Sequence, residues 1–400
     1  MLASAAPVES ETVALPAANG RIVAVRLCAA DDIVPFARAA MDGYALRAAE
    51  TQSANPAAPL TISVVDAAYA GDAPLRLAEG CAASVATGAP LPFGADAVVP
   101  FEDVIAARGT IRLCAPLVRG DYVFAPGEDA KAGDLLVDAG SMVTPGRTAL
   151  LAAAGHEAVA VYRRPRIAIV STGNEIVAIG DRPANGQIRN SNAAMLAAAV
   201  EADGAIVVFA AHAADVEGPL REALERACHC SDLVITTGGA SAGERDLVKR
   251  ALRASGAAFA FESIALRPAK PTAFARLGAA YVAVLPGNPA AAYIAYTALV
   301  RGLVRRLAGQ PRPFPAPVTA LLAGRLHRRD ERHCAVFGAL TRSGEAFTVR
   351  PLDNQCSSLV RTAADANALI IVEPGSGSIE AGDAVTVEVV DWNAVPVADP

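Results

Sequence analysis

The chain has 400 residues, of which 53% are hydrophobic and 19% charged. This composition excludes wholesale disorder, and the length suits several domains of about 100–200 residues each. The 35 basic and 41 acidic side chains give a net charge of −6, which argues against non-specific binding to nucleic acid or to an anionic membrane.

The sequence shows no membrane or export signal. No apolar run reaches the roughly 18 residues that a membrane span requires, and residues 289–300 are long enough only for a buried helix. The opening residues, MLASAAPVES, lack a basic start followed by an apolar block. We therefore expect a cytoplasmic protein without membrane or nucleic-acid partners.

Seven cysteines are spread over the chain, and this odd number argues against a disulfide framework. Cys228, His229 and Cys230 resemble part of a metal site, but no second Cys/His pair follows at zinc spacing. Reduced, buried cysteines are the favoured interpretation, and a metal site is the alternative.

The first 164 residues are predicted to form β-rich lobes. Strand-like runs at residues 61–65, 97–99, 111–114 and 135–137 alternate with glycine and proline turn signals, which do not fix the strand order. We expect a linker domain of residues 1–34 and 130–164, with a β-rich lobe of residues 35–129 inserted into it.

From residue 165 onward, strand and helix patterns alternate regularly, which is typical of a doubly wound parallel α/β domain. Apolar runs predict strands at residues 166–170, 205–209, 233–237 and 281–285, with further strand-like pieces within 258–266. Helical spacing predicts helices at residues 190–201, 216–228, 246–252 and 289–307. We expect this domain to span residues 165–309.

The C-terminal part is predicted to be a separate β module. Three prolines in QPRPFPA, residues 310–316, indicate a stiff connector. Apolar and polar residues alternate beyond it, as in VTVEV at 385–389, which predicts short half-buried strands. We expect residues 310–400 to form a small β-barrel or sandwich, so the fold class is α/β plus β.

The strongest local signal for a binding site is the glycine loop after the strand LVITT, in which Gly238, Gly239 and Ser241 follow Thr237. Backbone N–H groups at the end of a parallel strand can bind a phosphate, and glycine lets it approach closely. The loop has neither the Walker spacing nor the dinucleotide fingerprint. A tight strand-to-helix turn is the alternative.

Acidic side chains stand beside several loops: Asp42, Asp129, Glu175, Asp215 and Asp246. A carboxylate next to a phosphate is repelled unless a cation lies between them, so the set suggests magnesium. Taken singly, each residue could be a helix cap or a turn residue.

A cationic element follows in RPAKP, where Arg267 and Lys270 could clamp an oxyanion, with a solvated basic turn as the alternative. PGNPA then begins at Pro286. Asn288 and the first N–H groups of a helix that starts at Pro289 could face a ligand there, or the motif could be structural.

Eight motifs occur in one order along the chain: MDGYA, VATGAPLP, PGEDAKAGD, RRPRIAIVSTGNEIV, GQIRNSN, DLVITTGGASAGERD, RPAKP and LPGNP. In this order and spacing they resemble the molybdopterin molybdenumtransferase family, or molybdenum insertases, to which the E domain of gephyrin is similar. The resemblance implies a four-domain homodimer with an α/β domain that binds adenylylated molybdopterin and a C-terminal β-barrel. The implied reaction inserts molybdate into the dithiolene of molybdopterin, depends on Mg²⁺, and hydrolyses the adenylate to AMP.

The same resemblance implies roles for particular residues. The pterin phosphate or adenylate would be bound by the glycine loop, the PGNP loop and the β lobe: Thr237, Gly238, Gly239, Ser241, Pro286, Asn288, Pro289 and Thr87. The acids would hold Mg²⁺ or orient water: Asp42, Glu175, Asp215 and Asp246, with Asp129 at a further cleft position. Molybdate would be bound by Arg267, Lys270 and Ser357. The β lobe of a partner subunit would complete the cleft, and molybdopterin adenylyltransferase and molybdoenzyme chaperones are implied as protein partners.

Four positions depart from the family pattern. Arg267 and Ala269 replace a lysine and the glycine of KPGKP, Phe337 stands where an arginine is usual, and Asn174 stands where an aspartate is usual. A carrier or scaffold that binds molybdopterin without inserting molybdenum is therefore an alternative. A molybdopterin adenylyltransferase is a third hypothesis, against which the long flanking domains argue.

Overall fold

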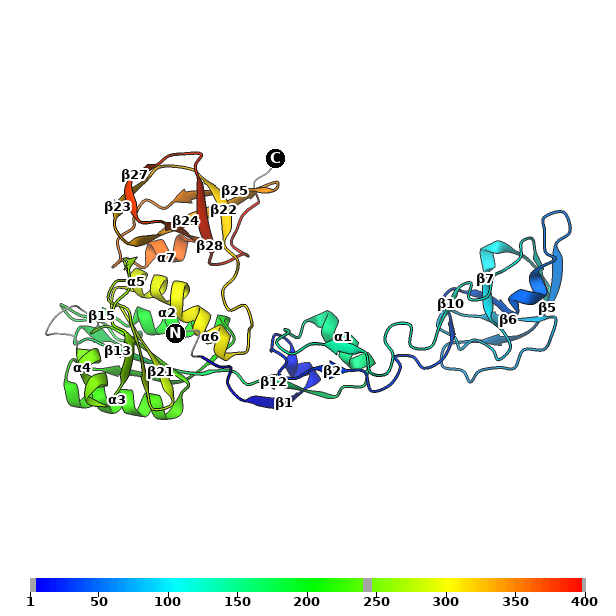
Figure 1. Cartoon of the computed structure of the whole chain (residues 1–400), viewed down its shortest axis with the longest axis horizontal. Helices are drawn as coiled ribbons and strands as arrows, with labels where there is room; N and C mark the ends of the chain where they lie inside the picture. The colour runs from blue at the N-terminus through cyan, green and yellow to red at the C-terminus, as the bar shows by residue number, and fades with distance from the viewer. Residues whose placement is uncertain (1–4, 240–246, 398–400) are drawn as a thin grey trace.

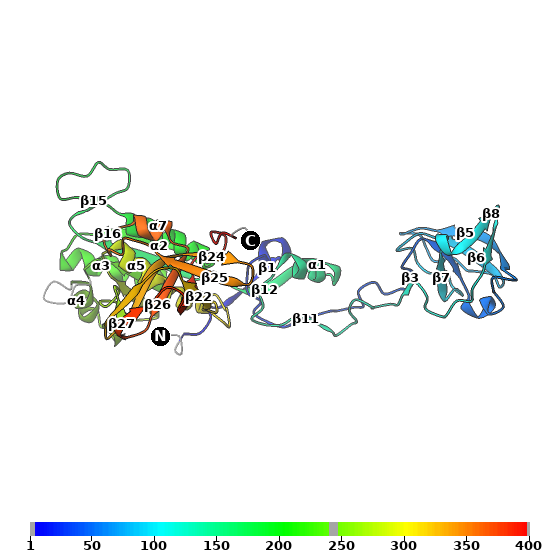
Figure 2. The ribbon, with the colours of Figure 1, turned by 90° about the horizontal axis from the view of Figure 1, so that it is seen from above.

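The computed structural model describes residues 5–239 and 247–397, apart from the side chains of residues 328–330. The molecule is elongated (Figure 1): an α/β domain and a β-barrel lie together at one end, a small middle part follows, and a β lobe lies at the far end. The view from above shows the same linear order (Figure 2). The expected multidomain fold class of α/β plus β is confirmed.

The α/β domain contains a six-stranded sheet in the order β16-β13-β17-β21-β20-β18. Its strands are β13 (Arg166–Thr172), β16 (Ile206–Ala213), β17 (Leu233–Thr237), β18 (Ala258–Phe261), β20 (Ala273–Leu277) and β21 (Ala280–Leu285). The first four in the sheet are parallel, but β20 and β18 are antiparallel to their neighbours. The expected parallel layer therefore comprises four strands, and Gly278, with φ +61°, closes a tight turn that joins β20 antiparallel to β21.

Helices cover both faces of this sheet, so the doubly wound arrangement is confirmed. They are α2 (Ser191–Ala202), α5 (Pro289–Ala295) and α6 (Arg301–Leu307) on one face, and α3 (Glu217–Cys230) and α4 (Leu247–Ala254) on the other. A hydrophobic core lies on each face of the sheet, and the side chains of β13 alternate between the two. Ile167 and Ile169 pack in the core on the first face, and Ala168 and Val170 in the core on the second.

The helix expected over residues 289–307 is interrupted. A π-helical turn, Tyr296–Val300, separates α5 from α6. The buried hydroxyl of Tyr296 donates a hydrogen bond of 2.7 Å to Asp203 Oδ2. Arg305 Nε donates to Asp203 Oδ1 at 2.8 Å, so this buried carboxylate joins the end of α2 to the π turn and to α6.

The C-terminal β module is a closed barrel, which agrees with the expectation. Five strands form the ring β24-β25-β22-β28-β26 and back to β24: β22 (Val318–Leu322), β24 (His333–Ser343), β25 (Ala346–Pro351), β26 (Ala368–Val372) and β28 (Ala384–Val389). Beside the ring lie the pair β23 (Leu326–Asp330) and β27 (Gly375–Ile379) and the short helix α7 (Arg361–Asp365). The α/β domain adds β19 (Leu266–Arg267) in parallel to β24, which ties the RPAKP segment to the barrel.

The middle part and the lobe are made of short strands. In the middle part, β1 (Ser10–Ala14) pairs with β12 (Ala158–Tyr162), β2 (Leu27–Cys28) pairs with β11 (Leu135–Val137), and α1 (Pro145–Ala153) packs beside them. The lobe has a six-stranded sheet of β7 (Ala97–Pro100), β4 (Gly43–Leu46), β6 (Cys81–Val85), β5 (Leu60–Ala68), β9 (Thr110–Leu113) and β8 (Val104–Ala107). At its base β3 (Arg38–Ala39) pairs with β10 (Val123–Phe124). The domain limits at residues 34, 129, 164 and 309 stay a prediction.

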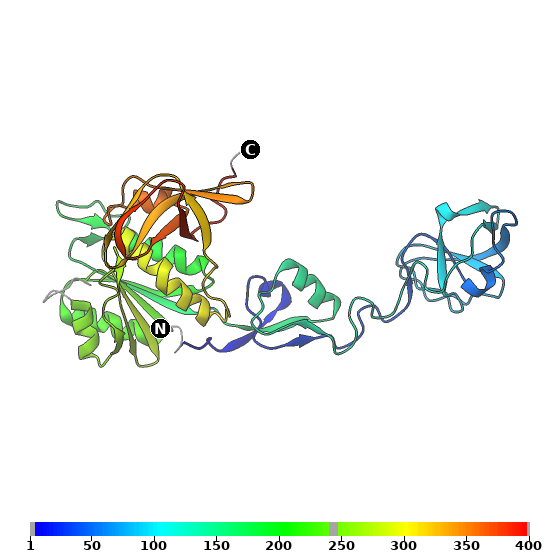
Figure 3. The ribbon, with the colours of Figure 1, turned by 45° about the horizontal axis from the view of Figure 1, so that its top comes forward.

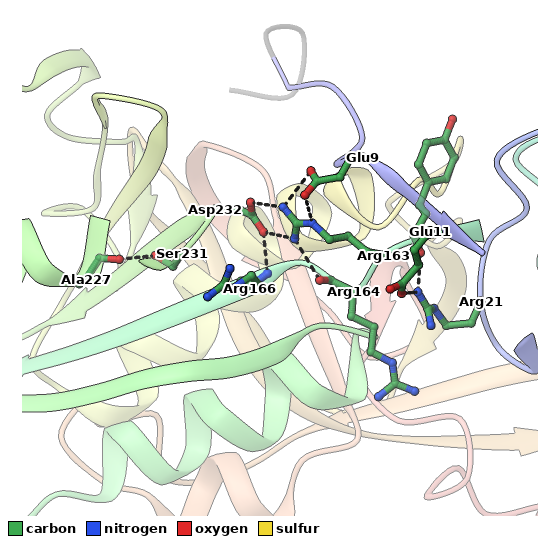
Figure 4. Close-up of polar contacts among 10 residues, drawn as sticks. Glu9, Glu11, Arg21, Arg163, Arg164, Arg166, Ala227, Ser231 and Asp232 are labelled. Carbon is green, nitrogen blue, oxygen red and sulfur yellow. Dashed lines mark hydrogen bonds and ion pairs between the residues drawn. The ribbon is translucent and has the colours of Figure 1, made fainter. Parts of the chain in front are cut away.

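A cluster of charges joins the middle part to the α/β domain (Figure 4). Arg163 donates two hydrogen bonds of 2.7 Å to the two carboxylate oxygens of Asp232, and it also pairs with Glu9. Asp232 Oδ2 accepts a further 2.7 Å bond from the backbone N–H of Arg166, at the start of β13. The chain segments that lead into and out of the middle part are therefore held to the α/β domain by one side chain.

Within residues 5–239 and 247–397, none of the helices has the length and apolar character needed to cross a membrane.

Candidate active site

A cavity of about 460 Å³ lies at the carboxyl ends of the parallel strands β13, β17 and β21. In open α/β sheets, ligands usually bind at this edge. Eight of the residues predicted from the sequence line it: Glu175, Asp215, Thr237, Gly238, Gly239, Pro286, Asn288 and Pro289. We call it the first cavity. The predicted residues Ser241 and Asp246 fall outside the described residues.

Two glycines of the first cavity stand where no larger residue fits. Gly238 has φ +94°, and a Cβ there would lie 2.1 Å from the carbonyl oxygen of Thr172. At Gly239, φ is +60°, and a Cβ would meet Val248 at 2.9 Å. The Thr172 backbone at Gly238 and the Val248 side chain at Gly239 thus leave no room for a larger residue, and glycine also permits close approach of an anion to the loop backbone.

The acidic side of the first cavity is made by Glu175 and Asp215. Thr172 Oγ1 donates a 2.8 Å hydrogen bond to Asp215 Oδ1. The backbone N–H of Asp215 donates to Asn174 Oδ1 at 3.1 Å. These contacts fix the Asp215 loop against the end of β13. Among the described residues, no group of three or more His, Cys, Asp or Glu side chains is arranged to hold a metal ion.

A second cavity of about 180 Å³ lies where the α/β domain meets the barrel. Arg267 and Ser357, both predicted to bind molybdate, line it together with Phe337 and Gln355. The Gln355 side chain exchanges two 3.0 Å hydrogen bonds with the backbone of Phe337. The volume is below the roughly 300–1,000 Å³ of drug-sized ligand sites, so this cavity suits a small ion.

The two cavities are neighbours. Pro268 contributes to both walls. Asn288 lines the first cavity and Ser357 the second, and Asn288 Nδ2 donates a 3.2 Å hydrogen bond to Ser357 Oγ. The backbone N–H of Ala290 also donates to the carbonyl oxygen of Ser357 at 3.1 Å. The barrel loop is therefore attached to the PGNP loop at the boundary of the two sites.

Other predicted residues lie elsewhere. The side chain of Lys270 is exposed and lines neither cavity. Asp42 and Thr87 lie in the lobe, where Asp42 Oδ1 accepts hydrogen bonds of 2.7 and 2.8 Å from the backbone N–H and hydroxyl of Thr87. These two bonds lower the pKa of Asp42. Asp129 is exposed and also lines neither cavity.

The cysteine cluster lies in the last turn of α3 and lines neither cavity. Burial raises the pKa of the Cys228 thiol to about 11, and the thiol of Cys230 donates to the carbonyl oxygen of Ala227. Zinc binds thiolate rather than thiol, so this environment favours buried cysteines over a metal site.

Three family models match consecutive parts of the chain. Residues 1–155 match the MoeA N-terminal region (domain I and II), residues 168–306 a probable molybdopterin binding domain, and residues 319–390 the MoeA C-terminal region (domain IV). A molybdopterin molybdenumtransferase from Staphylococcus aureus is 30% identical over 96% of this chain and 92% of its own length. This chain belongs to the molybdopterin molybdenumtransferase family.

Further comparisons agree with this assignment. Molybdopterin molybdenumtransferase 2 from Mycobacterium tuberculosis is 33% identical over 94% of both chains. The crystal structure of a molybdopterin biosynthesis MoeA protein from Pyrococcus horikosii has a TM-score of 0.85 and 32% identity, with 98% of this chain and 97% of that chain covered. The matches include both flanking regions, which favours the transferase family over the adenylyltransferase hypothesis.

Two departures from the pattern expected of the molybdopterin molybdenumtransferase family have a structural explanation. Asn174 still serves the acidic loop, because its side chain binds the backbone of Asp215. Phe337 is only 2% exposed, and its ring stacks on Tyr293 of α5 with centroids 6.4 Å apart. At this position an apolar contact between the barrel and the α/β domain replaces the expected cation.

Sequence reasoning missed several residues of the first cavity: Ser171 at the end of β13, and Ile188, Arg189, Asn190, Ser191 and Asn192 in the motif GQIRNSN. The motif contributed to the resemblance, but its residues were assigned no role. The signal was present, because Asn190 caps α2 by accepting a 3.1 Å bond from Ala193 N, and a cap at the end of a parallel sheet faces the ligand edge.

Proposed function

We propose that this protein inserts molybdate into adenylylated molybdopterin, with hydrolysis of the adenylate and release of AMP. The main support is the pairing of two unlike sites. An acidic cavity with a glycine loop, large enough for part of a pterin nucleotide, adjoins a smaller cavity with a guanidinium and a hydroxyl. Members of this family carry the name molybdopterin molybdenumtransferase, which describes a reaction that needs both ligands.

The residues of the first cavity would hold the phosphate-bearing substrate. Gly238 and Gly239 permit close approach of an anion, and Asn288 can orient it from the facing loop. Thr172 holds Asp215 toward the cavity, where its carboxylate can orient a water molecule. In the second cavity, Arg267 and the Ser357 hydroxyl would bind molybdate. Lys270, whose exposed side chain lines neither cavity, would have to reach the anion by a change of conformation.

Magnesium fits the donors of the first cavity. Glu175 and Asp215 offer hard carboxylate oxygens, and Mg²⁺ is usually held by one or two carboxylates together with substrate phosphates and water. We propose that these two residues hold it, with Asp246 as a third ligand. Bound there, the ion would neutralise charge that develops on the phosphoanhydride.

The position of the lobe supports a homodimer. The β lobe, to which Asp42 and Thr87 belong, lies at the end of the molecule opposite the α/β domain (Figure 3). They cannot contribute to the cavity of their own chain without a large rearrangement, so we propose that they complete the cavity of a second copy. We also propose a cytoplasmic location, with molybdopterin adenylyltransferase as the enzyme that supplies the substrate and molybdoenzyme chaperones as later partners.

The test is to incubate the purified protein with adenylylated molybdopterin, Mg²⁺ and molybdate. AMP is measured by chromatography, and active cofactor by reconstitution of a molybdenum-free apoenzyme. Both products are expected, and neither should form when Mg²⁺ is chelated. If neither forms in the complete mixture, the proposed function is wrong.

A carrier function is the second candidate, and Phe337 and Arg267 favour it. Their side chains stand where the family pattern has an arginine and a lysine. A carrier would bind the pterin tightly without releasing AMP or producing cofactor, so the same incubation separates the two functions.

A further inference from the structure

Asn192 is a buried side chain that joins the two loops of the first cavity. It is the second residue of α2 and is only 9% exposed. Its amide nitrogen donates a 2.7 Å hydrogen bond to Thr237 Oγ1 and a 2.8 Å bond to the carbonyl oxygen of Gly287. These partners lie 45 and 95 residues away in sequence, one at the end of β17 and the other between β21 and α5.

The link continues through Thr237. Its hydroxyl accepts the bond from Asn192 and donates a 3.1 Å bond to the carbonyl oxygen of Pro286. The glycine loop and the PGNP loop are therefore joined twice, once directly through Asn192 and once through the threonine. The loops also touch through backbone, because a Cβ on Gly287 would lie 3.3 Å from the Cα of Gly238.

The orientation of the Asn192 amide is fixed by these contacts. A side-chain amide has two N–H donors, and both are used on the two loops. The amide oxygen is buried and has no hydrogen-bond partner among the described residues. A buried acceptor left unpaired is destabilising, which is unexpected for a residue selected only for stability.

Asn367 in the barrel provides a contrast. It is also buried, but its amide oxygen accepts a 2.7 Å bond from Leu340 N. Its nitrogen donates to the carbonyl oxygens of Leu340 and Ala394 at 2.9 and 2.8 Å. All of these contacts are satisfied within the fold, and Asn367 lines neither cavity. It is a structural asparagine, whereas Asn192 lies in the wall of a cavity and joins two loops that line it.

We propose that Asn192 is a positioning residue, which holds the glycine loop and the PGNP loop at one spacing so that both can bind the same phosphate-bearing ligand. This inference rests on the proposed function. Asn192 would act by pre-organising the site. Loops that are already fixed before the ligand arrives lose no conformational entropy on binding, and such a loss would otherwise reduce the affinity for the ligand. Asn192 itself need not contact the ligand.

The test compares Asn192→Ala with Asn367→Ala. In Asn192→Ala, the KM for adenylylated molybdopterin should rise about tenfold, the equivalent of one or two lost hydrogen bonds, while kcat for AMP release changes less. Hydrogen exchange of the ligand-free protein should become faster in residues 233–239 and 280–288. Asn367→Ala should lower the melting temperature at least as much as Asn192→Ala does. Its KM, and its hydrogen exchange in those two segments, should stay at the wild-type values.

A second variant covers the case in which Asn192→Ala does not fold. Thr237→Val keeps the shape of the side chain but removes the hydroxyl that links Asn192 to Pro286, so it should raise KM and accelerate exchange in the same two segments. The inference is overturned if both folded variants, or the one that folds, keep the wild-type KM and the wild-type exchange in both loops. Hydrogen exchange needs no ligand, so a wild type that fails to bind the pterin refutes the proposed function separately.

Discussion

Asn288 Nδ2 and Ser357 Oγ are joined by a 3.2 Å hydrogen bond, although Asn288 lines the cavity at the sheet edge and Ser357 lines the cavity beside the barrel. The two residues belong to different domains and are 69 residues apart in sequence. Since Ser357 lines only the second cavity, we expect its hydroxyl to affect a ligand bound there more than one bound in the first.

Replacing Ser357 by alanine should therefore separate the two binding sites. The variant loses one hydroxyl donor to an oxyanion, which should raise the molybdate concentration needed for half-maximal cofactor formation about tenfold. Affinity for the adenylylated pterin should stay within about twofold. Titration calorimetry with each ligand measures both quantities. Equal loss of affinity for the two ligands would show that Ser357 supports the whole site rather than the oxyanion.

Asp215→Asn tests the acidic side of the first cavity. Asparagine keeps an acceptor for the Thr172 hydroxyl but removes the charge proposed for Mg²⁺. AMP release should fall about 100-fold, with a smaller change in pterin affinity. Thr172→Val is the matched control, because it removes the hydrogen bond and keeps the carboxylate. Thr172→Val should lower the rate of AMP release about tenfold at most. A larger loss in Thr172→Val than in Asp215→Asn would reject the charge as the essential feature.

Much of the α/β domain could be predicted from the sequence, because β13, β17 and β21 are short, almost wholly buried strands built around apolar runs and bounded by turn signals. β20 was not among the predicted strands, and the single Gly278 was too weak a sign of the tight turn that joins it to β21. The π turn at Tyr296–Val300 was missed because its largely apolar side chains continue the pattern of the helix.

The first cavity was easier to predict than the second. The loops that carry Thr237, Asp215 and Asn288 each follow a strand of one sheet, so the order of strands along the chain already brings these three residues to one edge. The second cavity forms only where two domains meet. No local sequence pattern predicts that Ser357 contacts Asn288 or that Phe337 stacks on Tyr293. The separation of Asp42 from the first cavity depends on how the chain runs through the middle part, which strand propensities do not encode.

The Asp42 carboxylate should respond to a change at Thr87. Two hydrogen bonds from Thr87 lower its pKa below the ordinary value of 3.8, so the bonds stabilise the folded lobe above that pH and are lost as the pH falls through the lowered pKa. Thr87→Ala removes the side-chain bond and keeps the backbone bond. The pKa of Asp42, measured by NMR titration of its carboxyl carbon, should rise part of the way toward 3.8. An unchanged pKa would mean that the backbone bond alone determines it.

Asp232→Ala should destabilise the junction between the middle part and the α/β domain. It removes the partly buried bidentate partner of Arg163 and the acceptor of an exposed bond from Arg166 N, at a cost of about 2–3 kcal/mol. Urea unfolding measures the loss in the free energy of unfolding. Small-angle scattering should show a wider range of molecular dimensions for the variant than for the wild type. Asp138→Ala breaks an exposed pair with Arg26 and should leave the free energy of unfolding nearly unchanged. Similar losses in the two variants would show that the Arg163 cluster does not join the two parts.

Phe337→Arg restores the residue that the family pattern has at this position, but it should harm this protein. The phenyl ring is 2% exposed and stacks on Tyr293, so an arginine would place a charge in the apolar contact between the barrel and α5. Urea unfolding should show a loss of about 3 kcal/mol, the usual scale for removing a buried aromatic ring. Phe36→Arg, at a ring that is 43% exposed in the lobe, controls for the added charge and should be nearly neutral. A stable Phe337→Arg variant with tighter molybdate binding would show instead that this site still accepts the anion contact typical of the family.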